Sequence, residues 1–355
     1  AAALQDALAR STIPAASIDL LISASAIAVQ ALPCSAAHIL KIAGLAPGTP
    51  GFDINSSCVS FISALQVAAG LLNAGTYRRI AIVSADLASR GIDWQHEESS
   101  LIFGDGAACA IVERGDGTGG ILASLVETYP AGSELCEIRA GGTRRNPRAG
   151  MCEQDFLFHM QGKPLFRQAS ALIEDYLDRL LSASGLTLGQ IATVVPHQAS
   201  HLSLEHMRKR LHVSSEALVD IYRHHGNQVA ASIPTALHAA VTTGRFNPGQ
   251  PVMLIGTAAG ECKDPAKMMP KAINSVIWRI GLFYVGSVVL LVLLLPWNAY
   301  QAGQSPFVTF FSKLGVPYIG TIMNIVVLTA ALSSLNSGLY STGRILRSLA
   351  MGGSA

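Results

Sequence analysis

The run GFDINSSC at residues 51–58 joins the local patterns from which the fold can be inferred. Residues 51–55 predict a short strand, and residues 58–73 follow with the apolar spacing of a helix, after a turn of small polar residues. Cys58 therefore stands at a predicted helix N-terminus, where free N–H groups and the helix dipole favour a thiolate. This position suits a nucleophile, although a single cysteine before an apolar helix is more often a core residue.

Outward from this run, strand and helix patterns alternate along the first 256 residues. Further strands are predicted at residues 18–23, 79–85, 107–113, 191–196 and 252–256. Further helices are predicted at residues 1–10, 35–43, 166–184, 203–211 and 228–243. This alternation is typical of a layered α/β architecture. Each half contains a strand that ends at a chemically reactive residue, which suggests a duplicated architecture, and residues 131–151 read as a long surface excursion.

Two later segments supply partners for a nucleophilic cysteine. His197 comes just after the strand pattern of residues 191–196, and Asn227 follows a turn glycine ahead of an apolar helix. Cysteine nucleophiles work with a histidine and an asparagine that are adjacent in space rather than in sequence. Alone, the histidine can also be explained as a core residue and the asparagine as a helix cap.

Four motifs occur in the order and spacing of one enzyme family. They are FDINSSC at residues 52–58, IFGDGAA at 102–108, VPHQAS at 195–200 and HHGNQVAASIPTAL at 224–237. Through them, residues 1–260 resemble the β-ketoacyl-acyl-carrier-protein (ACP) synthase III family of the thiolase superfamily. The resemblance implies a thiolase-like layered α/β fold. It also implies an acyltransferase of fatty acid or related biosynthesis, which condenses acyl-CoA or acyl-ACP with malonyl-ACP by decarboxylative Claisen chemistry.

The same resemblance implies roles for individual residues. Cys58 would hold the acyl group, while His197 and Asn227 would donate hydrogen bonds to the malonyl thioester carbonyl as it becomes an enolate. The backbone N–H groups of Cys58 and Ala259 would form a second oxyanion hole. A homodimer is implied, and neither a cofactor nor a metal ion is.

Basic side chains cluster on two of the predicted helices. In the family such a patch docks the acidic carrier protein, which implies that role here for Arg167, Arg208, Lys209 and Arg210; a solvated helix face explains the same residues equally well. The turn at residues 103–106 is expected to be architectural: its glycines let the backbone pass close by, and Asp105 caps or braces.

The charge balance changes at residue 260. Residues 1–260 carry 18 basic and 21 acidic side chains, a net charge of −3, which argues against a nucleic-acid partner. Residues 261–355 carry seven basic and two acidic side chains, a net charge of +5. The six cysteines show no CxxC pair and no disulfide-scaffold spacing, so we expect a reducing compartment and a cytoplasmic synthase region.

The last part of the chain predicts a helical hairpin in the cytoplasmic membrane. Its apolar stretches, about residues 276–297 and 316–340, are long enough to span a bilayer, and basic residues flank them on the outer sides. By the positive-inside rule both ends lie in the cytoplasm; a pair of buried core helices is the alternative. Residues 261–355 resemble bacterial amino-acid permeases of the amino acid–polyamine–organocation superfamily. They cover only two of that family's helices, so no transport function is inferred.

The join at residue 260 leaves the activity open. The sequence begins without the strand that normally opens such a domain, and the GTAAGE run at residues 256–261 leads into permease-like sequence instead of a final strand. We therefore expect a thiolase-like fold that is incomplete at both ends, in a region of residues 1–260. The alternatives to a condensing enzyme are a non-functional chimera of two fragments and a membrane-tethered thioester-binding protein.

Overall fold

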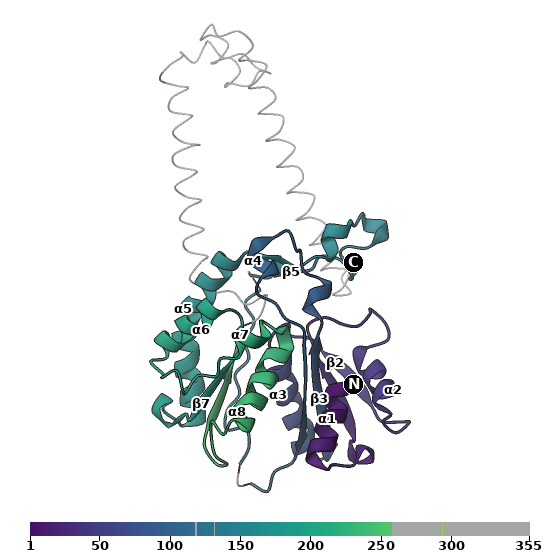
Figure 1. The fold of residues 1–355 in the computed structure, drawn as a ribbon, viewed down its shortest axis with the longest axis vertical. Coiled ribbons are helices and arrows are strands. Elements are labelled where there is room, and N and C mark those ends of the chain that lie inside the picture. Colours follow the sequence, from purple (N-terminus) through teal and green to yellow (C-terminus); the bar gives the residue numbers. More distant parts are fainter. Residues whose placement is uncertain (118, 131, 258–292, 294–355) are drawn as a thin grey trace. The chain divides into compact units, whose positions relative to one another are not determined.

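The computed structural model describes residues 1–117, 119–130, 132–257 and 293 (Figure 1). The chain divides into two units, Ala1–Asp264 and Pro265–Ala355. The helices and strands below all belong to the first unit.

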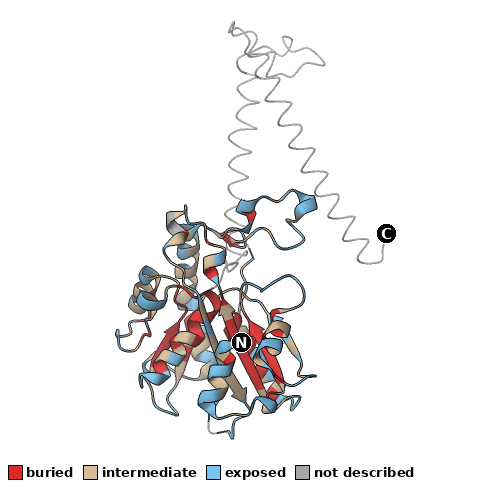
Figure 2. Ribbon diagram, turned by 45° about the vertical axis from the view of Figure 1, so that its right-hand side comes forward, coloured by how far each residue is buried: buried red, intermediate tan, exposed pale blue. Residues whose placement is uncertain are grey.

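The first half is built on a four-stranded sheet in the order β2-β1-β3-β4. Its strands are β1 (Leu20–Ala24), β2 (Gly51–Ile54), β3 (Arg79–Asp86) and β4 (Gly106–Glu113). Strand β1 is parallel to β2 and β3, whereas β4 is antiparallel to β3. Every residue of β1 is buried, as expected for a central strand covered on both faces (Figure 2).

The second half contains a parallel pair of strands, β7 (Thr193–Pro196) and β8 (Val252–Ile255). Its long helices are α5 (Gly162–Ser184), α6 (His201–Arg210) and α8 (Ser232–Thr242). The first half contributes α1 (Ala2–Ser11), α2 (Ser35–Ala43) and α3 (Ser60–Asn73).

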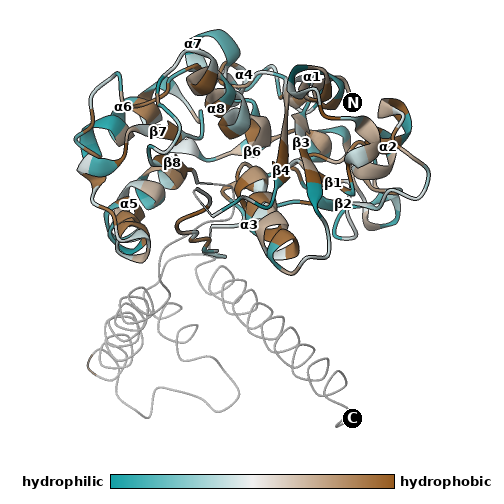
Figure 3. Cartoon of the chain, turned by 90° about the horizontal axis from the view of Figure 1, so that it is seen from below, coloured by the Kyte–Doolittle hydropathy of each residue, from teal (hydrophilic) through white to brown (hydrophobic). Residues whose placement is uncertain are grey.

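The hydrophobic core shows how these elements are layered (Figure 3). Helices α3 and α8 pack between the two sheets, through side chains such as Phe61 and Ile233 in one cluster with Ile22 and Val195. Helices α1 and α2 cover the other face of the larger sheet, and α5 covers β7 and β8 on their outer side. The result is an alternation of helical and sheet layers.

Shorter elements connect these layers. An antiparallel pair is formed by β5 (Cys136–Glu137) and β6 (His159–Met160), and the short helices are α4 (Glu97–Ser100) and α7 (Tyr222–His225). The 3-10 turns are η1 (Ala15–Ser17), η2 (Ala88–Arg90), η3 (Pro147–Ala149), η4 (Glu153–Phe156), η5 (Leu188–Gln190) and η6 (Val229–Ala231).

The layered α/β prediction is confirmed, and each predicted strand matches an observed strand to within two residues at either end. The predicted helix at residues 228–243 is wrong at its start. Val229 adopts φ +53°, which interrupts the helical geometry, so α8 begins only at Ser232. The surface excursion at residues 131–151 contains β5, which was not predicted.

Within the described part of the chain, no helix is both long and apolar enough to cross a bilayer. The predicted spans at residues 276–297 and 316–340 lie outside the described residues.

Candidate active site

Cys58 lies in a tight turn between β2 and α3. The Oδ1 atom of Asn55 accepts the Ser57 N–H at 2.9 Å, and the Oγ atom of Ser60 accepts the Ser56 N–H at 2.9 Å. Ser57 is held at φ +51°, a costly conformation for a residue with a side chain. Helix α3 begins at Ser60, so Cys58 stands just ahead of the helix N-terminus, as the sequence suggested, and its side chain is partly exposed to a pocket.

His197 follows directly after β7 and is buried. Its backbone N–H donates to the Ile255 carbonyl at 2.8 Å, which ties it to the end of β8. Burial lowers the pKa of His197 to about 4, so the imidazole is neutral near pH 7. Its buried Nδ1 atom has no hydrogen-bond partner among the described residues. A proton there would be an unsatisfied buried donor, which favours the tautomer protonated on Nε2.

Asn227 is fixed through both its main chain and its side chain. Its backbone N–H donates to the Ile102 carbonyl at 2.8 Å, and its carbonyl accepts the Gly104 N–H at 3.0 Å. The Val229 N–H donates to its Oδ1 atom at 2.9 Å, which identifies the amide oxygen. The Nδ2 atom makes only a long bond, 3.4 Å, to the Ala199 carbonyl. The amide is therefore oriented with its donor end available.

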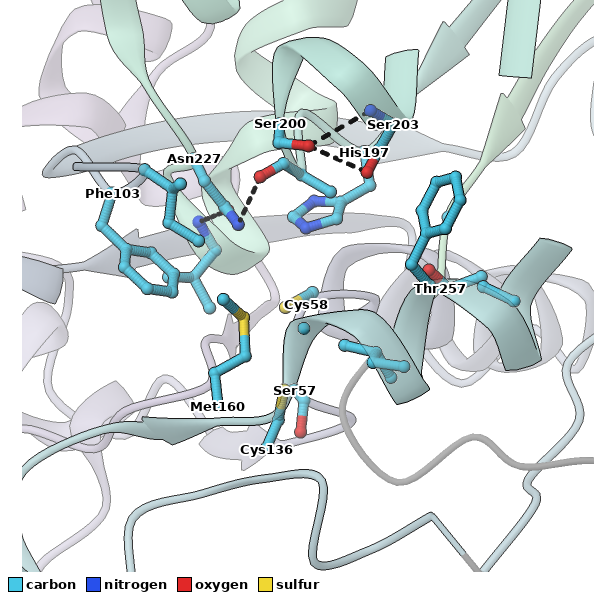
Figure 4. Close-up of a pocket in the computed structure, with 18 of the residues that line it drawn as sticks. Ser57, Cys58, Phe103, Cys136, Met160, His197, Ser200, Ser203, Asn227 and Thr257 are labelled. Atoms are coloured by element: carbon cyan, nitrogen blue, oxygen red, sulfur yellow. Dashed lines mark hydrogen bonds between the residues drawn. The ribbon is translucent and has the colours of Figure 1, made fainter. Parts of the chain in front are cut away.

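Cys58, His197 and Asn227 line one pocket of about 790 Å³ (Figure 4). The three predicted catalytic residues, separated widely in the sequence, are therefore brought together. The remaining wall is mainly apolar, and it includes Ile92, Phe103, Ile138, Phe158, Leu165 and Ile173. A pocket of this kind, apolar with a few directed polar groups, suits an acyl chain joined to a polar reacting centre. No cluster of three or more potential metal ligands occurs in the part of the chain that the structure describes.

Two polar side chains brace this pocket. Asp105 accepts the N–H and the hydroxyl of Ser89 at 2.8 and 2.7 Å, which confirms the bracing role expected for it. Gln198 is fully buried, donates to the carbonyls of Pro196 and Val219 at 2.8 and 3.1 Å, and accepts the Ile221 N–H at 3.0 Å. The bonds of Gln198 hold the turn that carries His197, a role that the sequence did not reveal.

Asp86, at the end of β3, was also missed. Its side chain is 1 % exposed and accepts three backbone N–H groups, from Ala26, Ile27 and Ala230. Burial, opposed by these hydrogen bonds, raises the pKa of Asp86 to about 6. The only sequence signal is an acidic residue directly after a buried strand.

The residues predicted to dock a carrier protein have different surroundings. Arg208 pairs with Glu205 at 2.8 Å on the same helix, and Arg210 pairs with Glu174 of α5. Arg167 lines the rim of the pocket, and Lys209 is exposed on α6. Ala259, the second predicted oxyanion donor, lies outside the described residues.

Matches to protein families follow the same division of the chain. Residues 52–130 match the family 3-oxoacyl-[acyl-carrier-protein (ACP)] synthase III, and residues 181–262 match the C-terminal domain of that synthase. Residues 246–355 match the amino acid permease family, so the two sets of matches overlap around the GTAAGE run.

Solved structures agree with the first assignment. The synthase III of Thermus thermophilus superposes with a TM-score of 0.66 at 28 % identity, over 72 % of this chain and 78 % of that chain. The synthase III of Pseudomonas aeruginosa superposes with a TM-score of 0.65 at 26 % identity, over 73 % and 78 %. OleA of Xanthomonas campestris, at 20 % identity and a TM-score of 0.62 over 73 % and 76 %, shares the fold.

The fold and the pocket define a thiolase-fold region of the condensing-enzyme type. More particularly, this region is related to 3-oxoacyl-ACP synthase III, and the predicted resemblance is confirmed. The matches do not favour the alternative of a non-functional chimera.

The C-terminal resemblance is confirmed as well. L-asparagine permease of Salmonella typhimurium is 91 % identical over 104 residues, which are 29 % of this chain and 21 % of the permease. L-asparagine permease 1 of Mycobacterium tuberculosis is 58 % identical over 138 residues, which are 39 % of this chain and 28 % of the permease. The chain thus joins two families, and it spans only 21 to 28 % of the length of these permeases.

Proposed function

We propose that the synthase region is an acyltransferase that condenses an acyl thioester with malonyl-ACP through an acyl-Cys58 intermediate. One observation carries the proposal: a cysteine just ahead of a helix N-terminus, a neutral buried histidine and an oriented amide line the same apolar pocket. Two neutral donors beside a nucleophile suit a reaction in which negative charge develops on a thioester oxygen.

In the first half-reaction, the Cys58 sulfur attacks the acyl carbonyl carbon. The bond from that carbon to the CoA or carrier sulfur breaks, and the departing thiolate takes up the proton that Cys58 has lost. The backbone N–H groups of Cys58 and Ala259 are the proposed donors to the transient oxyanion.

In the second half-reaction, the bond between the malonyl carboxylate and the α-carbon breaks and CO₂ leaves. The electron pair forms an enolate, whose oxygen accepts hydrogen bonds from His197 Nε2 and Asn227 Nδ2. The α-carbon then attacks the acyl carbonyl, a carbon–carbon bond forms, and Cys58 departs as a thiolate. His197 serves here as a neutral donor, so its low pKa is an advantage.

The first half-reaction is tested by incubating the full chain with an acyl-CoA and measuring its intact mass. We expect an adduct of one acyl group on the wild type, which Cys58→Ala abolishes and which Cys152→Ala, a substitution of an exposed cysteine, retains. His197→Ala and Asn227→Ala should also acylate, because those residues act later. A folded wild type that forms no adduct contradicts the proposed function. Acylation without any condensation product from malonyl-ACP instead favours the thioester-binding alternative.

We further propose that the region acts in the cytoplasm as a homodimer supplied by carrier protein, and that residues 261–355 insert into the bilayer. The identity to L-asparagine permeases and the uncharged stretches of the sequence support insertion. The full chain should stay in the membrane pellet after carbonate extraction, whereas a chain ending at residue 260 should be released. If carbonate extraction releases both chains from the membrane pellet, residues 261–355 do not insert into the bilayer.

A further inference from the structure

Asp86 is a buried carboxyl group that the proposed chemistry does not use. It does not line the pocket, but each of its oxygens holds a segment that does. Its Oδ1 atom accepts the N–H groups of Ala26 and Ile27 at 3.0 and 2.9 Å, and its Oδ2 atom accepts the Ala230 N–H at 3.0 Å. Because burying a carboxyl group costs free energy, stability alone is a poor explanation for it.

The segment held by Oδ2 is strained. Val229, the residue before Ala230, has φ +53°, which is a genuine outlier for a β-branched side chain. Such conformations persist only where the surrounding structure enforces them, and they cluster at functional sites. Here the Ala230 N–H is fixed by Asp86, and the Val229 N–H donates to Asn227 Oδ1 at 2.9 Å.

We propose that Asp86 is a positioning residue that acts through Val229 to aim the amide of Asn227. By anchoring Ala230, the carboxylate keeps Val229 in its strained conformation, with its N–H directed at Asn227 Oδ1. That bond turns the Nδ2 donor towards the reacting thioester. The inference rests on the proposed function, because it assigns the anchor to the step in which Asn227 acts.

The two segments held by Asp86 give it two separable effects. The Oδ1 bonds shape the part of the pocket wall formed by Ala26 and Ile27, whereas the Oδ2 bond controls Asn227. Removal of the Oδ2 acceptor alone should therefore impair the half-reaction that needs Asn227 and leave acylation of Cys58 intact.

Asp86→Asn makes this separation with almost no change in shape. If the amide oxygen keeps the bonds to Ala26 and Ile27, the amide NH₂ faces the Ala230 N–H, donor against donor. We expect decarboxylation of malonyl-ACP to fall about tenfold or more, while the rate of Cys58 acylation, followed by intact mass, stays within about twofold of wild type. Equal losses in both half-reactions, or no loss in decarboxylation, overturn the proposal. A wild type that cannot be acylated instead contradicts the proposed function.

Asp19→Asn is the matched control. Asp19 also accepts two backbone N–H groups, from Arg78 and Arg79 at 2.9 and 3.1 Å, but it lies at the opposite end of the paired strands β1 and β3. The Asp19→Asn substitution should change the ratio of the decarboxylation rate to the acylation rate by less than twofold. A shift in that ratio as large as that of Asp86→Asn would show that the effect is not specific to the anchor.

Val229→Gly supplies an independent test, because glycine adopts φ +53° without strain and has less need of an anchor. Adding Asp86→Asn to Val229→Gly should therefore cost several-fold less decarboxylation activity than adding it to the wild type. If the fold-loss of decarboxylation activity in the double variant equals the product of the losses in the two single variants, the proposal is overturned. If Asp86→Asn alone does not fold, the double variant carries the test: it should fold and acylate Cys58, and its failure to fold also overturns the proposal.

Discussion

The Gly104 N–H donates to the Asn227 carbonyl at 3.0 Å, which joins the turn at residues 103–106 to the loop that carries a predicted catalytic amide. The two backbones approach so closely that a Cβ atom on Gly104 would overlap the carbonyl oxygen of His225. Residue 104 must be glycine, because any other residue would place a Cβ atom against the His225 backbone. The turn is therefore architectural, as the sequence indicated, and it acts on Asn227.

Gly104→Ala should displace the Asn227 loop. We expect a loss of about 1–3 kcal/mol in the free energy of unfolding, as for other overpacked sites, and at least a tenfold loss of condensation activity. Chemical denaturation and a condensation assay measure the two effects. Gly142→Ala is the control, because a Cβ atom there meets nothing within 4 Å. Wild-type activity in Gly104→Ala would show that the close approach does not position Asn227.

His197 makes stability depend on pH. Burial lowers its pKa from an ordinary value of 6.5 to about 4 in the folded protein. Between these values the unfolded state binds the proton and the folded state does not, so the His197 contribution to stability falls as pH falls from about 6.5 to 4. The loss should be about 3 kcal/mol in all, and about 2 kcal/mol between pH 7 and pH 5.

Asp86 has the opposite slope, because its raised pKa of about 6 makes its contribution fall as pH rises from about 4 to 6. The two slopes partly cancel in the wild type. The measurement is therefore a difference: urea unfolding of the wild type and of His197→Ala at pH 7 and pH 5. The variant should lose about 2 kcal/mol less than the wild type over this interval. Val241→Ala, a substitution of an exposed side chain that does not titrate, should retain the wild-type slope, and equal slopes in all three proteins would contradict a neutral buried His197.

Gln198→Met should destabilise the protein. Methionine fills a similar volume but leaves the carbonyls of Pro196 and Val219 and the Ile221 N–H without their partner. Unsatisfied buried groups cost about 1–3 kcal/mol each before relaxation, so we expect a loss on the order of 3 kcal/mol. Gln154→Met, at an exposed position, is the control and should change the free energy of unfolding by less than about 0.5 kcal/mol. A Gln198→Met variant as stable as that control would mean that water or a rearrangement satisfies the same groups.

The candidate catalytic residues could be selected from the sequence because each follows a local signal. His197 comes directly after β7, Cys58 lies in the turn that follows β2, and Asn227 follows the turn glycine Gly226. Strand ends gather at the edge of a layered sheet, so local patterns suffice to find the residues that meet there.

The supporting contacts could not be predicted in the same way. The bond from Ala230 to Asp86 joins residues 144 positions apart, and the positive φ of Val229 has no signal in its residue type. The basic cluster illustrates the same limit, because the carboxylate paired with Arg210 lies on α5, 36 residues away. Composition shows that charges are present, but only the packing of helices shows which of them are already paired.

Arg167→Glu tests the remaining basic residues as a docking site. Arg208 and Arg210 are engaged by carboxylates, whereas neither Arg167 nor Lys209 takes part in an ion pair within the described residues, and Arg167 lies at the pocket rim. Reversing its charge should raise the KM for a carrier-protein thioester about tenfold and leave kcat nearly unchanged, because the interaction precedes the chemistry. The KM for an uncharged N-acetylcysteamine thioester should stay within about twofold of the wild-type value.

Lys41→Glu, on the exposed face of α2, is the control for the change in net charge. Equal increases in KM for both thioesters in Arg167→Glu would place its effect in the pocket itself rather than in recognition of the carrier.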